Sequence, residues 1–324
     1  MIEKILIYIS DSCNPYKNLA TESYLFDNVS DNECILYLWQ NENTIVIGRN
    51  QNPWAECNIE EMKKDNVLLA RRLSGGGAVF HDMGNLNFTF IAKQDNYNLE
   101  KQLEVIKKAC NLAGINAEIS GRNDILADGR KFSGNAFYNS KGTSYHHGTI
   151  LINSNKEKLQ KYLTPNELKL KTKGIRSVKS RVINLCEINS LLTCEKMKEY
   201  MSEAFCDVYN LKASFIEEIP KEKIADNENL YGDNSYTYGK SAPFTFSCEG
   251  FFSRGSIKLL LNVEKGIITE VECYTDSMDW TLSESLKKTL LNSPFEKQSI
   301  INTLSNTNIP QSDDIIKLIE KQKI

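Results

Sequence analysis

The pattern of apolar and polar residues divides the chain into short strands and amphipathic helices. Runs rich in β-branched and aromatic residues predict strands, and apolar residues three or four positions apart predict helices. In the first half of the chain the predicted strands are residues 2–9, 34–39, 44–48 and 67–70, two strands between 78 and 91, and residues 150–152. We expect the runs Cys34–Trp39 and Thr44–Gly48 to form a hairpin, because only the polar residues Gln40–Asn43 separate them.

Capping signals predict where helices begin and end. Asn14 followed by Pro15 is typical of a helix start, with asparagine as the N-cap and proline at the first helical position. Gly114 stands where a C-terminal cap is expected, after a run of helical apolar positions that begins at Leu99. The other predicted helices begin after the polar residues Asn58, which has Glu61 three positions later, and Thr193.

A polar segment predicts a boundary between two domains. Between Pro220 and Pro243 the chain is rich in Asn, Asp and Tyr, a composition typical of a linker. We therefore divide the chain into a domain of residues 1–243 and a smaller domain of residues 244–324. The smaller domain contains three predicted strands, 244–252, 256–263 and 267–274, and then two or three helices, the last capped by Ser312. No catalytic cluster is visible in it, so we assign it an accessory role.

The stretch ARRLSGGGAVFHDMGNLNFTF, residues 70–90, is the first candidate for a ligand-binding loop. Gly75–Gly77 have no Cβ, so the backbone there can adopt positive φ and bring its N–H groups close to an anion. Arg71 and Arg72 supply guanidinium groups that suit a phosphate or a carboxylate. A Gly-rich turn with a purely structural role is the alternative. The stretch has neither the Gly-Lys-Ser/Thr of a P-loop nor a GxGxxG spacing.

A second candidate is the segment SGRNDILADGRKFSGNAFY, residues 120–138. Asp128-Gly129 is a strong two-residue turn signal, and a hairpin there would place Asp124 and Lys131 on neighbouring strands. The structural alternative is a surface hairpin with an ion pair, which contributes little to stability. The small residues Ser133–Ala136 favour instead the close approach of a ligand or of another backbone.

The three histidines of the chain, His81, His146 and His147, lie in or beside these segments, which raises the question of a zinc site. Neighbouring residues of a strand point to opposite faces, so His146 and His147 are not expected to share one ion. No cysteine or HExxH spacing completes a ligand set. We therefore expect hydrogen bonding inside a pocket rather than metal binding.

The segment KLKTKGIRSVKSR, Lys169–Arg181, carries six basic residues and no acidic one. It could be a solvated loop, cover phosphates, or receive an acidic partner. Nucleic-acid binding is the least favoured of these readings, because the segment lacks the interleaved aromatic residues of a single-strand platform.

Composition restricts the class of protein further. The chain has 324 residues, 41% of them hydrophobic, which is enough for a large and a small domain with real cores. A formal net charge of -3 argues against a protein that coats nucleic acid or an anionic membrane. Nine cysteines, an odd number without CxxC pairs, favour reduced thiols. The apolar run Ile5–Ile9 is too short for a signal sequence or a membrane span, so we expect a cytoplasmic protein.

Four segments resemble, in this order, the lipoate-protein ligase A family: RRLSGGGAVFHDMGNLNF, GRNDI with GRKFSGNAF, HHGTILIN, and KGIRSVKSRVINL. The resemblance covers nearly all of residues 1–245, and the C-terminal region resembles the small accessory domain of the family in position and size. It implies an α+β fold shared with biotin ligases and class II aminoacyl-tRNA synthetases. That fold is a mixed, largely antiparallel sheet flanked by helices, here with a small C-terminal α+β domain.

The resemblance also implies a two-step reaction. Lipoate attacks the α-phosphate of ATP to give lipoyl-adenylate and pyrophosphate, and the lipoyl group then passes to a lysine of an acceptor domain. The implied acceptors are lipoyl domains of 2-oxoacid dehydrogenase subunits and the glycine-cleavage H protein. The sequence does not choose between them, or between lipoate and octanoate. The invariant lysine of the family matches Lys131, which would contact the carboxylate and the α-phosphate together.

Matching the motifs residue by residue implies further roles. The residues that would line the lipoate and phosphate pocket are Arg72, Gly75, Gly76, Gly77, His81 and His147. Those that would contact ATP or the adenylate are Arg72, Gly77, Ala78, Val79, Phe80, Asn123, Asp124, Lys131, Ser133, Gly134, Thr149 and Arg181. Asp124 is also a candidate ligand of Mg²⁺. The basic segment Lys169–Arg181 resembles the adenylate-binding loop of the family, which we expect to close after ATP binds.

Three other readings remain open. An ATP-independent octanoyl- or lipoyltransferase of the same superfamily would need a nucleophilic cysteine near Lys131, yet no cysteine lies between Cys110 and Cys186. A module that binds lipoyl-adenylate without turnover is disfavoured by the intact Lys131 and glycine stretch. A biotin ligase is disfavoured because its GRGRxGR-like loop is absent and Gly48–Gln51 resembles it only distantly.

Overall fold

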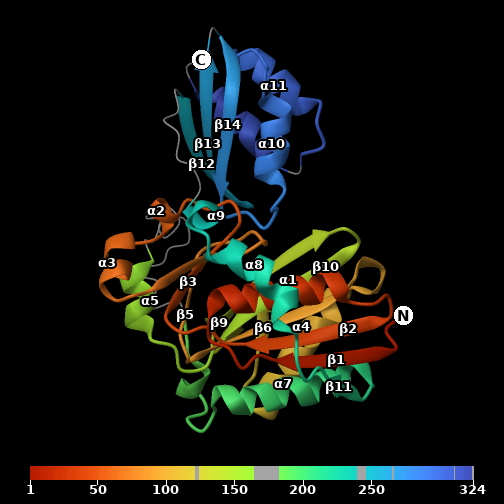
Figure 1. The fold of residues 1–324 in the computed structure, drawn as a ribbon. Helices are drawn as coiled ribbons and strands as arrows, with labels where there is room; N and C mark the ends of the chain where they lie inside the picture. The colour runs from red at the N-terminus through yellow and green to blue at the C-terminus, as the bar shows by residue number, and fades with distance from the viewer. Residues whose placement is uncertain (121–123, 164–181, 239–245, 265, 310, 323–324) are drawn as a thin grey trace.

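The computed structural model describes residues 1–120, 124–163, 182–238, 246–264, 266–309 and 311–322. It shows a large N-terminal domain and a smaller C-terminal domain that lies against one end of it (Figure 1). The basic segment Lys169–Arg181 and the predicted boundary between residues 243 and 244 lie outside the described residues. The closing loop and the position of the boundary therefore stay predictions.

A mixed sheet forms the centre of the described large domain. Its order is β11 (Ala213–Phe215), β1 (Lys4–Ile9), β2 (Glu33–Trp39), β6 (Asn85–Lys93), β10 (Thr143–Leu151), β9 (Arg130–Ser140), β8 (Asp124–Ala127) and β7 (Glu118–Ser120). The pairs β11–β1 and β1–β2 are parallel, and the remaining neighbours are antiparallel. The predicted mixed, largely antiparallel sheet is confirmed.

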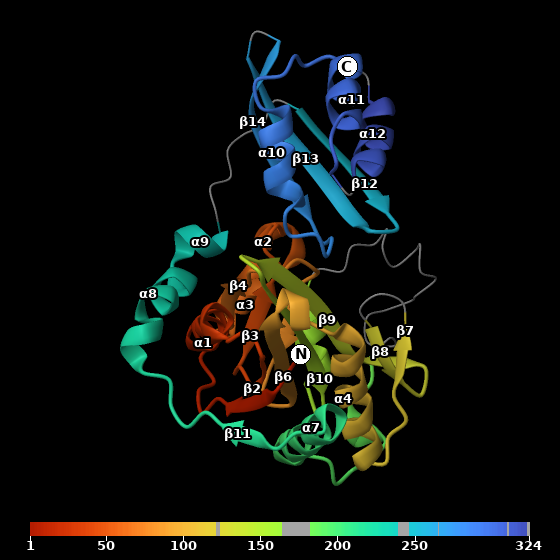
Figure 2. The ribbon, with the colours of Figure 1, turned by 90° about the vertical axis from the view of Figure 1, so that its right-hand side faces the viewer.

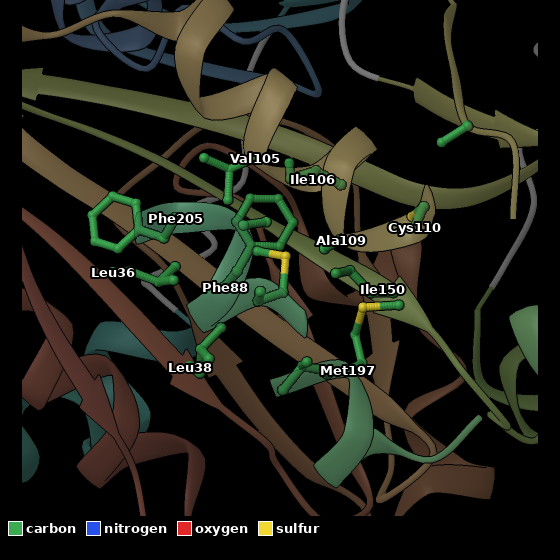
Figure 3. Packing of buried hydrophobic residues seen from close by; sticks show 14 of the residues in the cluster. Leu36, Leu38, Phe88, Val105, Ile106, Ala109, Cys110, Ile150, Met197 and Phe205 are labelled. Atoms are coloured by element: carbon green, nitrogen blue, oxygen red, sulfur yellow. The ribbon is translucent and has the colours of Figure 1, made fainter. Parts of the chain in front are cut away.

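Helices cover both faces of this sheet and create two separate cores. On one face lie α4 (Leu99–Leu112) and α7 (Cys194–Tyr209), and on the other lie α1 (Pro15–Asn28) and α8 (Lys221–Gly232) (Figure 1). Figure 3 shows the first core, where Phe88 and Ile150 of the sheet meet Ile106 of α4 and Phe205 of α7. All four side chains are fully buried, and burial of apolar surface is the main force that holds such layers together.

The predicted helix starts are confirmed. Asn14 accepts hydrogen bonds from the N–H groups of the first turn of α1, and Pro15 is the first residue of that helix. Asn58 caps α3 (Ile59–Lys64) and Thr193 caps α7 in the same way. Gly114 follows α4 with a positive φ of 71°, as a C-terminal cap requires.

The predicted hairpin of Cys34–Trp39 with Thr44–Gly48 is wrong. β3 (Thr44–Ile47) leaves the main sheet and pairs with β4 (Leu68–Arg71) and β5 (Val79–His81). This small sheet packs against α3 and α5 (Lys156–Tyr162), and the short helix α2 (Pro53–Glu56) precedes α3. The connection is no surface turn, because Gln40 and Asn41 are buried and hydrogen-bonded to residues 83 and 81. A polar connection here redirects the chain instead of reversing it.

The polar segment after Pro220 is not a linker over its described length. Residues 221–238 form α8 and α9 (Asn234–Tyr238), and α8 packs along α1. Ile224 and Tyr231 are buried in the second core, and the hydroxyl oxygen of Tyr231 lies 2.7 Å from Ser23 Oγ. The composition suggested a linker because polar residues such as Asp226 and Asn229 cover the exposed side of α8.

Replacing Tyr231 with phenylalanine tests whether α8 belongs to the core of the large domain. The variant keeps the ring but removes a hydroxyl that is hydrogen-bonded to Ser23, so we expect the free energy of unfolding to fall by about 1 kcal/mol. Equilibrium denaturation with urea measures the difference. Tyr24→Phe is the matched control on α1, and an effect of Tyr231→Phe no larger than the effect of this control would contradict the assignment.

The C-terminal domain has a sheet and a core of its own. β12 (Phe246–Phe252), β13 (Gly255–Glu264) and β14 (Ile267–Thr275) form an antiparallel sheet, which confirms the three predicted strands. The helices α10 (Leu282–Leu290), α11 (Lys297–Ser305) and α12 (Ser312–Glu320) pack against it. Ser312 is the first residue of α12 and not its cap, because Gln311 occupies the cap position. The β12–β13 turn lies at the end of the sheet that faces the large domain (Figure 2). Over the described residues, no helix has the length and apolar character needed to cross a membrane.

Candidate active site

A cavity of about 380 Å³ lies between the large domain and the C-terminal domain. Residues of β9 and β10 form its floor, and the glycine stretch with β5 forms one wall. The β12–β13 turn of the C-terminal domain forms a further wall. The glycine stretch and the hairpin that the sequence singled out therefore meet at one cavity, as is typical of a binding site between two domains.

Lys131 reaches the cavity from the hairpin of β8 and β9. Asp128 and Gly129 form the turn with φ angles of 49° and 69°, as expected for an Asp-Gly hairpin. Lys131 Nζ lies 2.6 Å from Asp124 Oδ1, which confirms the predicted pairing, and the two side chains are 25% and 16% exposed. A Cβ on Gly134 would lie 3.0 Å from Lys131 Nζ, so the glycine leaves room for the amine.

Arg72 is buried beneath the glycine stretch and holds its shape. Its guanidinium donates to the carbonyl oxygens of Val46, Gly75 and Gly77 and to Ser74 Oγ, at distances from 2.7 to 3.2 Å. Burial lowers the pKa of Arg72 to about 10, so the group stays charged at neutral pH. In this arrangement the guanidinium supports the loop directly and gives the cavity a positive charge behind the glycines.

Arg71 does not line the cavity, so the expectation that it offers a guanidinium to an anion there is wrong. Its side chain is 8% exposed, and burial lowers the pKa of the group. Its guanidinium donates to the carbonyl oxygens of Gly48, Arg49 and Gln51, which precede α2, and to those of Tyr236 and Thr237 in α9. It therefore joins these two segments. The role of Arg71 is structural.

Gly75 and Gly76 contact the C-terminal domain. The N–H of Gly76 donates to the carbonyl oxygen of Ser277 at 3.0 Å, and a Cβ on Gly75 would lie 2.3 Å from that oxygen. Gly77 is different, because a Cβ there would meet no atom within 4 Å and the residue lines the cavity. Of the three glycines, Gly77 is the one with room for a ligand beside it.

Further contacts dock the C-terminal domain on the large one. The N–H of Thr275 donates to the carbonyl oxygen of Asn50 at 2.8 Å, and Asn50 Nδ2 donates to the carbonyl oxygen of Trp280 at 3.0 Å. The guanidinium carbon of Arg49 lies 4.9 Å from the centre of the Trp280 ring, which also packs against Tyr138. These backbone and ring contacts fix the position of the cavity wall that the C-terminal domain supplies.

His147 links the glycine stretch to α1. Its Nε2 lies 2.7 Å from Ser74 Oγ, and its Nδ1 lies 2.9 Å from Glu22 Oε1. Glu22 is 3% exposed and also accepts a hydrogen bond from Thr89 Oγ1 at 2.7 Å, as a buried carboxylate requires. The sequence analysis missed Glu22, because its position on α1 gives no sign that it is buried.

His81 and His146 are buried and neutral. Loss of hydration on burial lowers the pKa of each to about 3, and the Arg72 guanidinium adds to this effect at His81. His81 lines the cavity, and its Nδ1 lies 3.1 Å from Asn41 Nδ2. His146 points to the other side of the sheet, among aromatic side chains of the first core, and its Nε2 lies 2.7 Å from Asn135 Oδ1. The prediction that His146 and His147 face opposite sides is confirmed.

Most of the site residues predicted from the sequence lie at this cavity. Those that line it are Arg72, Gly76, Gly77, Ala78, Val79, His81, Asp124, Lys131, Gly134, His147 and Thr149. Gly75, Phe80 and Ser133 do not line it; Phe80 packs against Tyr162 in the core of the small sheet, and Ser133 is fully buried. Asn123 and Arg181 lie outside the described residues. The ligand contacts of all these residues stay predictions.

The sequence analysis missed further lining residues in both domains, among them Leu19 and Val46 of the large domain. Trp39 and Asn87 are cross-strand neighbours on β2 and β6. The second group belongs to the C-terminal domain and comprises Phe251–Ser256, Asp276 and Met278. The C-terminal domain therefore contributes residues to the cavity, which the accessory role assigned to it from the sequence did not include. No local pattern marks either group. Trp39 and Asn87 come together through strand pairing, and the residues of the C-terminal domain reach the cavity only because the domains dock.

Comparison with known proteins places the chain in a family. Residues 14–206 match the family described as lipoyl protein ligase A/B catalytic domain, and residues 241–324 match the family described as bacterial lipoate protein ligase C-terminus. The chain belongs to the lipoate-protein ligase family, as the resemblance of its four motifs indicated.

Individual relatives extend over almost the whole chain. The chain is 41% identical to the lipoate-protein ligase A of Psychrobacter cryohalolentis over 307 residues, which cover 92% of this chain and 91% of that protein. It is similar to the crystal structure of P. falciparum LipL1 in complex with lipoate, with a TM-score of 0.87 and 34% identity, covering 98% of this chain and 100% of that one. A structure of lipoate-protein ligase A bound with ATP shares the fold, with a TM-score of 0.63 and 21% identity, covering 74% of this chain and 99% of that one.

Proposed function

We propose that this chain attaches lipoate to a lysine of an acceptor protein in two steps, through a lipoyl-adenylate made from lipoate and ATP. Lipoate ligation follows from membership of the family. Solved relatives are described with lipoate in one case and with ATP in another, which supports both substrates. The observation that carries the two-step scheme is the position of Lys131, which lines the same cavity as the glycine stretch.

Lys131 would offset the repulsion between the two substrates. The lipoate carboxylate and the α-phosphate are both anionic, so they approach one another only when a cation lies close to both. At about 4 Å and an effective dielectric constant of about 20, one such charge pair is worth about 4 kcal/mol. Asp124, at 2.6 Å from the amine, holds Lys131 in the cavity instead of in solvent.

The lining of the cavity offers groups that suit both substrates. Leu19, Trp39 and Val46 supply apolar side chains that suit the hydrocarbon and dithiolane part of lipoate. Gly77 and Ala78 supply backbone beside open space, which suits the phosphates of ATP. The carboxyl group of lipoate and the α-phosphate would meet near Lys131, which lines the same cavity.

We further propose Asp124 as a ligand of Mg²⁺. Over the described part of the chain, no group of three or more His, Cys, Asp or Glu side chains could hold a metal ion by itself. A nucleotide-bound Mg²⁺ takes one or two protein carboxylates and completes its shell with phosphate oxygens and water. Asp124 fits this requirement, because its carboxylate lines the cavity. When bound, the ion would neutralise charge on the phosphates.

The acceptor that we propose is a lipoyl domain of a 2-oxoacid dehydrogenase subunit or the glycine-cleavage H protein. In the second step the lysine amine of the acceptor would attack the acyl carbonyl carbon and displace AMP. Walls on several sides of the cavity would keep water from the acyl-adenylate until that lysine arrives.

An ATP-independent acyltransferase is the rival proposal. It would pass the acyl group through a cysteine thioester, so a cysteine should stand beside Lys131. Among the described residues, those that line the cavity include no cysteine. This observation favours the ligase.

A lipoylation assay tests the proposal. The full chain is incubated with ATP, Mg²⁺, lipoate and candidate acceptor domains, and the mass of the acceptor is measured. We expect the acceptor to gain one lipoyl group with ATP and none when ATP is omitted. Transfer from an acylated donor protein without ATP would support the transferase, and no acceptor modified under either condition would contradict both.

A further inference from the structure

Three buried side chains form a hydrogen-bonded chain from α1 to the wall of the cavity. Asn18 and Asn41 are fully buried, and His81 is 3% exposed. Asn18 Nδ2 lies 2.9 Å from Asn41 Oδ1, and Asn41 Nδ2 lies 3.1 Å from His81 Nδ1. The other ring nitrogen of His81, Nε2, is buried without a hydrogen-bond partner among the described residues, and His81 lines the cavity.

The orientation of the Asn18 amide is fixed by its surroundings. Its Nδ2 faces the carbonyl oxygens of Ser12 and Gln40 at 3.0 and 2.8 Å. Carbonyl oxygens accept but cannot donate, so the atom that faces them must be the amide nitrogen. The amide oxygen of Asn18 then accepts from Ser10 Oγ and from the Tyr37 hydroxyl, at 2.7 and 3.1 Å.

This orientation determines the protonation of His81. The Asn41 atom that faces the Asn18 nitrogen must be an oxygen, so the Asn41 nitrogen faces the imidazole ring. Because that nitrogen donates, His81 Nδ1 must accept and carries no proton. An imidazolium would set two donors against one another. The ring is therefore neutral, and its single proton is on Nε2, the atom without a partner.

We propose that Asn41 is a positioning residue that holds His81 as a neutral imidazole, so that His81 Nε2–H donates to the carboxyl oxygen of the bound acyl substrate. The identity of the acceptor atom rests on the proposed function, since lipoate has no oxygen outside its carboxyl group. A neutral donor leaves the carboxylate unprotonated and nucleophilic for the first step. The same donor stabilises the negative charge that develops on the carbonyl oxygen when the lysine attacks.

The tautomer can be read directly in the full chain. The sequence has three histidines, so ¹⁵N-labelled histidine gives three ring systems, and His81→Gln assigns one of them by its loss. Long-range ¹H–¹⁵N correlation spectra at pH 7 are expected to show the proton of His81 on Nε2 and a bare Nδ1. A proton on Nδ1, or a charged ring at pH 7, would overturn the proposal. This measurement does not depend on lipoate being the substrate, so an outcome that overturns this proposal would leave the proposed function standing.

Asn41→Asp reverses the decisive hydrogen bond, because a carboxylate can accept from Nδ1 but cannot donate to it. We expect the proton of His81 to move to Nδ1, and kcat for lipoyl transfer to fall about tenfold to thirtyfold with KM for ATP little changed. Asn111→Asp, at an exposed position of α4, makes the same chemical change and should leave both the spectrum and kcat unaltered. Normal kcat in an Asn41→Asp enzyme whose proton has moved to Nδ1 would overturn the proposal.

A double variant separates positioning from a general loss of packing. Glutamine at position 81 offers an amide N–H in place of Nε2–H and has no tautomer for Asn41 to select. Adding Asn41→Asp to His81→Gln should therefore lower kcat by less than about twofold more. A further tenfold loss would show that Asn41 serves the fold and would contradict the proposal. If Asn41→Asp does not fold, the histidine spectrum of the unchanged chain decides the question.

Discussion

Replacing Lys131 with alanine is expected to slow lipoyl-adenylate formation about a thousandfold, the equivalent of the roughly 4 kcal/mol that one close charge pair supplies. The variant should fold, because the Lys131 side chain is 25% exposed and its amine reaches the cavity rather than a hydrophobic core. Without the amine, no lysine charge would offset the repulsion between the carboxylate and the α-phosphate as they approach. Lipoate-dependent exchange of pyrophosphate into ATP measures this step.

Two further substitutions sharpen the result for Lys131. Lys131→Arg should also fail, because a planar guanidinium cannot replace a compact ammonium group in the space beside Gly134. Arg130→Ala is the matched control, since Arg130 pairs with Glu187 at 3.4 Å and does not line the cavity. Near-normal exchange in Lys131→Ala, or an equal loss in Arg130→Ala, would contradict the role that we assign to Lys131.

Gly75→Ala is expected to destabilise the docked arrangement of the two domains by about 2–3 kcal/mol. The added Cβ would lie 2.3 Å from the carbonyl oxygen of Ser277 and 3.0 Å from that of Met278, and backbone atoms cannot rotate away as a flexible side chain does. The two segments must separate, which also breaks the hydrogen bond from the Gly76 N–H to Ser277. We expect the melting temperature to fall by a few degrees and lipoyl transfer to fall about thirtyfold to a hundredfold.

Gly77→Ala is the contrasting variant. A Cβ at Gly77 would meet no atom within 4 Å, so the melting temperature should stay the same. The methyl group would enter the cavity, so we expect KM for ATP to rise. Calorimetry and steady-state kinetics on both variants distinguish the two effects. An unchanged melting temperature in Gly75→Ala would show that the contact with Ser277 does not hold the domains together.

The sequence predicted the features that depend on near neighbours. The Asp128-Gly129 turn places the strands around it side by side, which brings Asp124 and Lys131 onto neighbouring strands. The start of α1 at Asn14 follows in the same way from a side chain that caps its own helix. A few dihedral angles decide each of these features, and the residues that set them stand next to one another in the chain.

The predictions that failed concern contacts between distant segments. Gln40 and Asn41 suggested a turn because polar residues between two strands usually form one. They are instead buried against residues 83 and 81, and β3 consequently joins another sheet. Arg71 suggested an anion ligand, but carbonyl groups of α9 and of residues 48–51 occupy its guanidinium. A polar side chain takes its role from the segment that comes to lie against it, and one sequence does not show which segment that is.

The cavity that we propose for the substrates is bounded jointly by two domains that each have their own hydrophobic core. A substitution at Asn50 or Trp280 that tilts the C-terminal domain would widen or narrow the cavity without altering the hairpin that carries Lys131. Substitutions at residues that do not line the cavity would therefore change the preference for longer or shorter acyl chains. A search for variants with altered acyl-chain preference should therefore include residues of the contact between the two domains as well as residues that line the cavity.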